Sequence, residues 1–414
     1  MQPDLITVLF CVALGATLIV KTTLMVRQIR HVRARRGTVP AAFADSIGLD
    51  AHQRAADYTA DRMRLSLVEL AVSALLVVTL TLGGVLQAIS TLCTAAFEHG
   101  SLAHGVALLA ALGIVGWIVD LPFALYRTFV LEKRYGFNRM TPGLFLSDTV
   151  KQTVLAALIG LPLLAGVLWL MGAMGTLWWL WVWAVWLGFN LLVLLIWPTF
   201  IAPLFNRFSP LADEQLKQRV EALLERCGFR AKGLFVMDGS RRSAHGNAYF
   251  TGFGASKRIV FFDTLLDKLN AREVEAVLAH ELGHFHHKHI VKRLLVLAPG
   301  SLALFALLGW LLPQQAFFVG LGVSRPGTAE GLALFFLVLP WFTFVLTPLM
   351  SLWSRRHEFE ADAYAARHAR ASDLVSALVK LYRDNASTLT PDPVYSGFFD
   401  SHPPAAVRIT RLQT

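Results

Sequence analysis

The feature that most constrains how this chain can fold is a series of seven apolar stretches. A helix that crosses a bilayer needs about 20 predominantly apolar residues. The stretches of that length lie at residues 6–26, 66–90, 104–124, 154–174, 176–199, 293–313 and 331–352. Only 16% of the residues are charged, against about 25% in ordinary soluble domains. The sequence therefore predicts a mostly α-helical membrane protein, in which spans 4 and 5 form a hairpin because a short turn near Gly172 joins them.

Basic residues are concentrated in alternate loops. The segments rich in Lys and Arg are 27–65, 125–153, 200–292 and the tail after residue 353. By contrast, the loop at 91–103 has no Lys or Arg, and the loop at 314–330 has only Arg325. Because basic loops stay in the cytoplasm, we predict a multi-pass protein of the cell inner (plasma) membrane, with the N-terminus outside and the C-terminus inside. The same loops account for the net charge of +10, so no nucleic-acid partner is expected.

The spans divide the chain into four segments. These are 1–199 with spans 1–5 and their basic loops, 200–292, 293–352 with spans 6 and 7, and 353–414. The second and fourth segments are polar and are expected in the cytoplasm. In the second, an amphipathic helix is predicted at Leu211–Arg226. Three short apolar runs follow it and favour a small antiparallel sheet: Gly233–Met237, Ala248–Phe253 and Arg258–Phe262.

Three polar residues lie inside the apolar stretches: Glu69, Asp120 and Asn190. An unpaired polar group is costly in a bilayer, so these side chains should face a bundle interior or a water-filled space. They either line a functional pathway or only fix helix packing by pairing between helices, and the sequence favours neither.

Two histidines one helical turn apart are the main functional signal in the polar segment 200–292. Asn270 and Glu273 form a capping box, so a helix begins there. His280 and His284 then project from one face of that helix. Two imidazoles at this spacing can hold a single Zn²⁺, and Glu281 between them can act as a general base toward water. The alternative is a chance match at a polar helix end beside the membrane.

A catalytic zinc site needs a third protein ligand, and the nearby sequence offers few. His287 lies three residues beyond His284 on a helix that we expect to continue, where it would strain a tetrahedral site. There is no Asp or Glu between Glu281 and Glu330. The loop charges place Glu330 on the opposite side of the membrane, which excludes it as a ligand of this ion.

The next acidic residues, Glu358, Glu360 and Asp362, follow span 7 directly. Spans 6 and 7 cross the membrane and return, so residues just before span 6 and just after span 7 meet at the same face. On a helix, Glu358 and Asp362 share a side and Glu360 points away from it. Either of the two could bind zinc while the other holds a ligand or a basic partner. The alternative is an ordinary solvated charge cluster at the membrane edge.

At this point the sequence resembles a known family. HELGH followed by SRRHEFEADAYA is similar to the membrane-integrated M48 zinc peptidases, specifically the CAAX prenyl protease 1 (Ste24-type) group. The resemblance extends from about residue 50 to the C-terminus. Four further stretches resemble that group in the same order: LPFALYRTFVLEKRYGFN (121–138), IAPLFNRFSPL (201–211), SRRSAHGNAYFTGFG (240–254) and FFDSHPP (398–404).

The resemblance implies a seven-helix membrane barrel around a chamber, with a zincin-like metalloprotease domain and one zinc ion at its cytoplasmic end. It implies that Glu358 is the third ligand and that Asp362 supports a ligand from behind. Asn247 and His402 would approach the substrate or the oxyanion, and Asn247–Phe250 would be an edge to which a peptide adds as a strand. Arg408, after the SHPP sequence, is expected to pair with the acidic residues of the site.

The sequence thus predicts a membrane zinc metalloendopeptidase with a peptide or protein substrate, prenylated or membrane-inserted. Its Ala-, Leu- and Arg-rich composition indicates a bacterial member, in which prenylated substrates are not expected. Cleavage of misfolded or jammed membrane polypeptides, as membrane protein quality control, is then the interpretation. The alternative function is a multi-span transporter or binding protein with a non-catalytic zinc site. An intramembrane-cleaving protease fits less well, because the motif lies on a polar, capped helix before a span.

Overall fold

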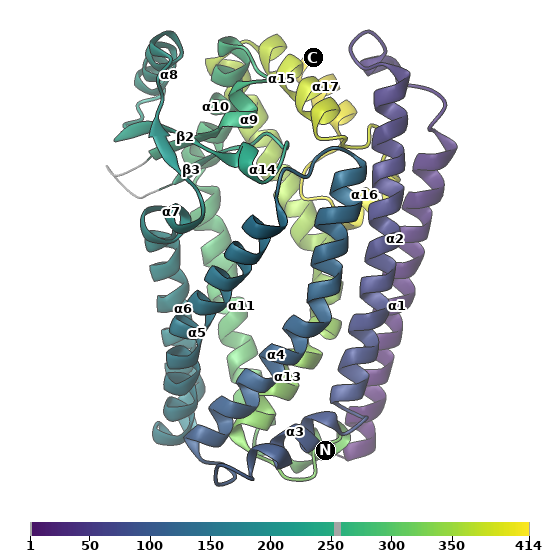
Figure 1. The fold of residues 1–414 in the computed structure, drawn as a ribbon, viewed down its shortest axis with the longest axis vertical. Coiled ribbons are helices and arrows are strands. Elements are labelled where there is room, and N and C mark those ends of the chain that lie inside the picture. The colour runs from purple at the N-terminus through teal and green to yellow at the C-terminus, as the bar shows by residue number, and fades with distance from the viewer. Residues whose placement is uncertain (1, 252–257, 414) are drawn as a thin grey trace.

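The structure is a computed structural model that describes residues 2–251 and 258–413. Long helices run between two ends of the molecule, and a small sheet gathers with short helices at one end (Figure 1). Among the described residues, seven helical segments are long and apolar enough to cross a membrane, which confirms the predicted number of spans. They are α1 (Pro3–Ala34), α2 (Leu49–Leu80), α4 through η2 (Leu102–Glu132), α5 (Pro142–Ala173), η3 through α7 (Gly175–Phe205), α11 (His289–Leu311) and α13 through α14 (Thr328–His368).

Several of these helices extend far beyond the apolar stretches. Helix α2 begins at Leu49, in the polar loop before the second stretch, and α14 (Thr347–His368) continues through the polar sequence after the seventh. Hydropathy marks only the part of a helix that faces lipid, whereas backbone hydrogen bonding continues into polar sequence. Glu358 and Asp362 consequently lie on the same continuous helix as the end of the last span.

The shorter elements form the polar end of the molecule and close the other end. Three helices are parts of the composite spans: α6 (Trp178–Ile196), α7 (Ala202–Phe205) and α13 (Thr328–Thr343). The remaining helices are α3 (Val85–Cys93), α8 (Glu214–Arg226), α9 (Asp263–Leu266), α10 (Ala271–His286), α12 (Gln315–Gly320), α15 (Ala371–Asp384), α16 (Pro393–Phe399) and α17 (Ala405–Gln413). Figure 1 shows α8, α10, α15, α17 and the C-terminus at one end, and the N-terminus with α3 at the other. The segments before span 6 and after span 7 therefore meet at one end, as predicted.

The predicted sheet is present, but its expected antiparallel arrangement was wrong. The four strands β1 (Phe208–Pro210), β2 (Gly233–Met237), β3 (Ala248–Thr251) and β4 (Arg258–Phe262) form a mixed sheet in the order β1-β2-β4-β3. Strands β3 and β4 pair antiparallel, and β4 lies parallel to β2. Strand β3 follows β2 in the sequence but does not pair with it. In the described part of the chain it pairs only with β4, at the edge of the sheet, so β3 is an outer strand. The last two residues of the predicted strand Ala248–Phe253 lie outside the described residues.

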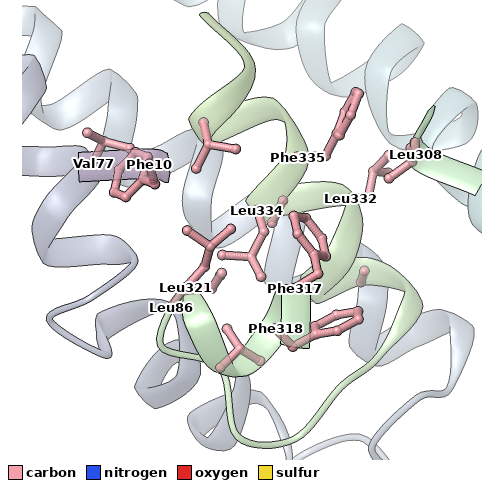
Figure 2. Close-up of a cluster of buried hydrophobic side chains, with 14 of the residues drawn as sticks. Phe10, Val77, Leu86, Leu308, Phe317, Phe318, Leu321, Leu332, Leu334 and Phe335 are labelled. Atoms are coloured by element: carbon pink, nitrogen blue, oxygen red, sulfur yellow. The ribbon is translucent and has the colours of Figure 1, made fainter. Parts of the chain in front are cut away.

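Two apolar clusters hold the ends of the molecule together. Figure 2 shows the larger one, in which side chains of α1, α2, α3, α11, α12 and α13 pack at the end away from the sheet. The second cluster fixes α10. Leu278 and Leu282 of α10 are fully buried against Phe261 of β4, Tyr364 of α14 and Leu374 of α15. Helix α10 is therefore clamped between the sheet and α14, which positions the histidine motif.

The three polar residues inside the spans have different surroundings. Glu69 pairs with Arg127 of the neighbouring span. Asn190 donates from its amide to the carbonyl of Trp186 on its own helix. Asp120 lines a cavity of about 730 Å³ between α4, α5 and the sheet. Pairing therefore accounts for the first two, and only Asp120 faces an open interior space.

The capping box at Asn270 is confirmed, and Glu273 does more than cap. The Asn270 side chain accepts from the Glu273 N–H at 3.0 Å, and Glu273 accepts from the Asn270 N–H at 2.8 Å. Glu273 is 2% exposed and also accepts from Ser376 at 2.6 Å and Lys380 at 2.7 Å, both on α15. This carboxylate therefore joins the start of α10 to α15. Burial alone would raise the pKa of Glu273, but the bonds from Lys380, Ser376 and the backbone hold it below its usual value.

We expect Glu273→Gln to lower the free energy of unfolding by about 1–3 kcal/mol, because Lys380 loses its charged partner. The difference from wild type should be fully present above pH 4.5, the ordinary pKa of this group, and should shrink as the pH falls through the lower folded pKa. Unfolding of the protein in detergent at several pH values measures both the loss of free energy and its pH dependence. The exposed Glu221→Gln on α8 is the control, expected within about 0.5 kcal/mol of wild type. Equal effects of the two changes would contradict this role.

Candidate metal centre

Helices α10 and α14 lie close enough to touch through their backbones at Gly283. A Cβ atom placed on Gly283 would lie 2.8 Å from Cα of Ala361 and 3.0 Å from its carbonyl oxygen, which is closer than side-chain atoms approach. The glycine of the HELGH motif therefore allows the two helices to pack at this distance. As a result, side chains one turn to either side of Gly283 face those of α14.

His280, His284 and Glu358 converge at this crossing. Nε2 of His280 lies 3.2 Å from Nε2 of His284. The Glu358 carboxylate lies 3.4 Å from each of these nitrogens, through Oε2 to His280 and Oε1 to His284. Bonds of 2.0–2.2 Å around a tetrahedral zinc ion place its ligand atoms about 3.3 Å apart. The spacing thus fits one ion. Oε2 of Glu358 is buried without a hydrogen-bond partner among the described residues, as a vacant ligand atom would be.

Asp362 and Arg408 hold His280 from behind. The carboxylate of Asp362 lies 2.9 Å from Nδ1 of His280. Arg408 of α17 donates to both oxygens of Asp362, at 2.8 and 2.6 Å, and is itself 5% exposed. A hydrogen bond at Nδ1 fixes the ring orientation and leaves Nε2 free to bind a metal. Asp362 therefore lies one turn beyond Glu358 and behind His280, as the family resemblance implies, and Arg408 pairs with it.

His284 has a corresponding support that sequence reasoning missed. Nδ1 of His284 lies 2.9 Å from Nδ1 of His289, and Nε2 of His289 lies 2.8 Å from Oε2 of Glu360. In the neutral assignment that satisfies both contacts, His289 donates to Glu360 and accepts from His284, leaving Nε2 of His284 free. The prediction that the motif helix continues beyond His287 was wrong. Helix α10 ends at His286, and Lys288 adopts a left-handed conformation (φ 55°), which turns His289 back toward the motif.

Glu281, His402 and Asn247 differ in how they lie relative to the three ligand residues. Glu281 is half-buried on α10, next to His280. Nε2 of His402 lies 3.4 Å from Oε1 of Glu358, and its side chain is 61% exposed. Asn247 is exposed at the start of β3 and bonds its neighbour Ala248. No contact among the described residues joins Asn247 to the metal cluster.

Comparisons with known proteins agree with this geometry. Residues 28–207 match the model of the CAAX prenyl protease N-terminal domain with five membrane helices, and residues 210–414 match peptidase family M48. A CAAX prenyl protease 1 homolog of Arabidopsis thaliana is 38% identical over 76% of this chain and 74% of its own length. The chain belongs to the CAAX prenyl protease 1 family.

Other members of the CAAX prenyl protease 1 family match over most of the chain. The homolog of Oryza sativa subsp. japonica is 34% identical over 95% of this chain and 94% of its own, and the Saccharomyces cerevisiae protein is 38% identical over 75% and 72%. The crystal structure of S. mikatae Ste24p is 31% identical, with a TM-score of 0.91 over 100% of both chains. These relatives are eukaryotic, and the bacterial origin stays a prediction.

This CAAX prenyl protease 1 family member is therefore a membrane zinc metalloendopeptidase. The M48 family implies a metal cofactor, generally zinc, and the cluster of His280, His284 and Glu358 has the donor set and spacing to hold it. The predicted fold class, function and enzyme class are confirmed. The transporter or binding-protein alternative is not favoured.

The protonation of the two histidines also fits an ion. Burial lowers the pKa of His280, but the bonds to Asp362 and Glu358 outweigh it and raise that pKa to about 9. Burial and the charge of His280 lower the pKa of His284 to about 3. At neutral pH the two facing rings thus carry one positive charge between them. Metal binding requires deprotonated ligands. A bound dication would therefore replace the proton that gives the two histidines their positive charge.

The groups around the cluster are shifted in directions that suit proton transfer. Burial, followed by the nearby charge of Glu358, raises the pKa of Glu281 although His280 opposes it. Burial is the largest cause that lowers the pKa of His402, and the nearby positive charges of Arg408 and His280 lower it further. Both groups therefore stay uncharged more readily than in water, and shifted pKa values of this kind are common at functional sites.

Three neighbouring cavities share lining residues. The cavity of about 730 Å³ that Asp120 lines shares Arg242 with a second of about 540 Å³, which Asn247 lines. The second shares Asn385 with a third of about 300 Å³, lined by His402. Asn247 and His402 therefore line neighbouring cavities.

Proposed function

We propose that this protein hydrolyses peptide bonds in lipid-modified or membrane-inserted polypeptides, with one zinc ion per chain held by His280, His284 and Glu358. The observation that carries the proposal is the mutual spacing of 3.2–3.4 Å among the three ligand atoms, with Glu281 beside them. Asp362 and Arg408 would keep His280 in the binding orientation. The membrane barrel would then consist of segments 1–199 and 293–352. The cytoplasmic protease unit would consist of segments 200–292 and 353–414.

The roles of the remaining residues follow from their positions. When bound, zinc supplies a Lewis acid that polarises a carbonyl and makes water more acidic. Glu281 takes a proton from the attacking water and later donates it to the leaving amine. Its raised pKa suits both steps. His402, 3.4 Å from Glu358, donates to the developing oxyanion.

The substrate is bound as an extended peptide along β3. This strand is one of the two outer strands of the sheet, and among the described residues only β4 pairs with it, so its second edge can accept another strand. Asn247 lies at the start of that edge and would bond the peptide or direct it toward the ion. The cavity of about 730 Å³, which Trp117, Leu121 and Phe145 line together with Asp120, offers apolar surface for a lipid chain. The named relatives are CAAX prenyl proteases, which favours a prenylated C-terminal peptide.

The location and the second substrate class rest on the sequence. The basic loops favour a cytoplasmic site in the inner (plasma) membrane, with the N-terminus outside. The inference that the protein cleaves misfolded membrane polypeptides is based on its amino-acid composition, which is typical of bacterial proteins. An unmodified peptide separates the two substrate classes.

The test compares purified wild-type protein and Glu281→Gln on a farnesylated CAAX peptide and the same peptide without the lipid, with and without a chelator. We expect wild type to cleave the farnesylated peptide, the lipid to lower KM, and both the chelator and Glu281→Gln to stop cleavage. Equal cleavage of the two peptides would instead support the unmodified substrate class. Cleavage that survives both the chelator and the Glu281 change would overturn the proposed chemistry.

A further inference from the structure

A second group of metal-ligating side chains lies at the other end of the molecule. It consists of His99 in the loop before α4, His104 in α4 and Glu330 in α13, and one ligand atom from each lies within 4.8 Å of the others. Figure 1 shows α3, which borders this group, near the N-terminal end of the bundle and away from the sheet. The proteolytic site therefore has no part in it.

The group is largely buried, and one polar atom of each residue lacks a hydrogen-bond partner. His104 is 0% and Glu330 is 1% exposed. Among the described residues, Nε2 of His99, Nδ1 of His104 and Oε2 of Glu330 are buried without a hydrogen-bond partner. Buried polar atoms without a hydrogen-bond partner are costly unless an occupant of the site satisfies them.

In His104 and Glu330, a second polar atom is already held in an orientation that suits metal binding. Nε2 of His104 lies 3.0 Å from the carbonyl oxygen of Ser90, so that nitrogen donates and Nδ1 keeps its lone pair. The Ser90 hydroxyl donates to Oε1 of Glu330 at 2.5 Å. Ser90 of α3 thus supports both residues from behind, in the way that Asp362 supports His280.

Two spatial features favour an ion over plain packing. Nε2 of His99 lies 3.4 Å from Oε1 of Glu330, the oxygen that also accepts from Ser90. This separation suits two ligands of one tetrahedral zinc ion and is too long for a good hydrogen bond. Glu330 is also the third residue of α13, from which a glutamate commonly bonds its own N-cap N–H. Its Oε2 makes no such bond to Gly327, although a Cβ on Gly327 would lie 2.1 Å from this oxygen. The carboxylate is thus used for something other than capping.

We propose that His99, His104 and Glu330 bind a second transition-metal ion, with Zn²⁺ as the preferred species. Two imidazoles and one carboxylate suit zinc, whereas calcium and magnesium prefer oxygen ligands. A cavity of about 360 Å³, lined by His104 and Glu330, provides an entry path and room for a water ligand. Because the ligands come from α4, α13 and the loop between α3 and α4, the ion joins spans that are distant in sequence. Its role is structural: it fastens this end of the bundle.

The test counts zinc in full-length protein in which the proteolytic cluster has been removed by His280→Ala and His284→Ala. After equilibrium dialysis against Zn²⁺ in detergent, we expect two zinc ions per chain in wild type and one in this background. Adding Glu330→Gln, which keeps the bond from Ser90, or His99→Gln should remove the remaining ion. Glu98→Gln, at the exposed position beside His99, should leave it in place.

Thermal unfolding gives an independent readout in the same proteins. Zinc should raise the melting temperature of the background protein and of its Glu98→Gln form, and should leave that of the Glu330→Gln and His99→Gln forms unchanged. Monodisperse elution of each variant shows that it is folded. A background protein that binds no zinc, or one whose zinc survives both ligand changes, would overturn the second site. The result does not depend on the proposed function, because the background lacks its metal ligands.

Discussion

Replacing Glu281 with Gln is expected to lower kcat/KM by about 10²–10⁴-fold while the protein keeps its zinc. Glutamine has nearly the same shape as glutamate but cannot accept the proton of the attacking water at neutral pH. The three ligand atoms belong to His280, His284 and Glu358 and are untouched by the change. The loss should appear in kcat, because proton transfer contributes to the transition state more than to substrate binding.

The measurement pairs peptide turnover with zinc content on the same preparation. Glu221→Gln is the matched control, since Glu221 is an exposed glutamate on α8 and should retain wild-type turnover. The pH profile adds a check. Burial raises the pKa of Glu281, so the acidic limb of kcat/KM in wild type should lie above the ordinary glutamate range, with activity rising as this group loses its proton. Turnover that persists in Glu281→Gln at an unchanged rate would exclude this residue as the base.

The parts of this molecule that follow from short-range rules could be predicted from its sequence. The spacing of His280 and His284 places them on one face of any helix, and the capping box at Asn270 fixes where that helix begins. The number of spans follows from hydropathy. Glu358 could be brought to the histidines by counting membrane crossings, although only the family resemblance distinguished it from Asp362. In the structure the two differ by one turn, so that one reaches Nε2 and the other Nδ1 of His280.

The parts that depend on long-range order or on one unusual backbone angle could not be predicted. The left-handed conformation of Lys288 has no signature in HHKHI, yet it brings His289 behind His284. Strand β4 lies between β2 and β3, so β2 and β4 are parallel; sequence order alone suggests a meander. Glu330, which the loop charges excluded as a ligand of the first ion, accepts a hydrogen bond from Ser90 of α3. His99 lies in the loop before α4 and His104 lies in α4, and the sequence around them contains no metal-binding motif.

The second large effect is expected on Glu358→Gln, which should weaken zinc binding at the proteolytic centre by more than about 100-fold. Loss of an outer-shell partner of a zinc ligand costs 10–100-fold, and a direct, charged ligand should cost more. Glu358 is 3% exposed, so an amide in its place would also leave the dication without a compensating negative charge in a dry site. The binding is measured by chelator competition in a Glu330→Gln background, where only this centre contributes.

Glu360→Gln is the matched control because Glu360 lies two residues away on α14 and faces a different partner. Its Oε2 bonds Nε2 of His289 at 2.8 Å, and the amide oxygen of glutamine can still accept that bond. We therefore expect at most about a 10-fold loss of affinity and retained turnover. The two changes remove one negative charge each from the same helix, so a general electrostatic effect would lower affinity equally. A large loss of zinc affinity that occurs only in Glu358→Gln would mean that the polar end of α14 packs against α10 and supplies a ligand to the ion. Equal losses, or zinc retained without Glu358, would mean that the ion is held by another set of ligands.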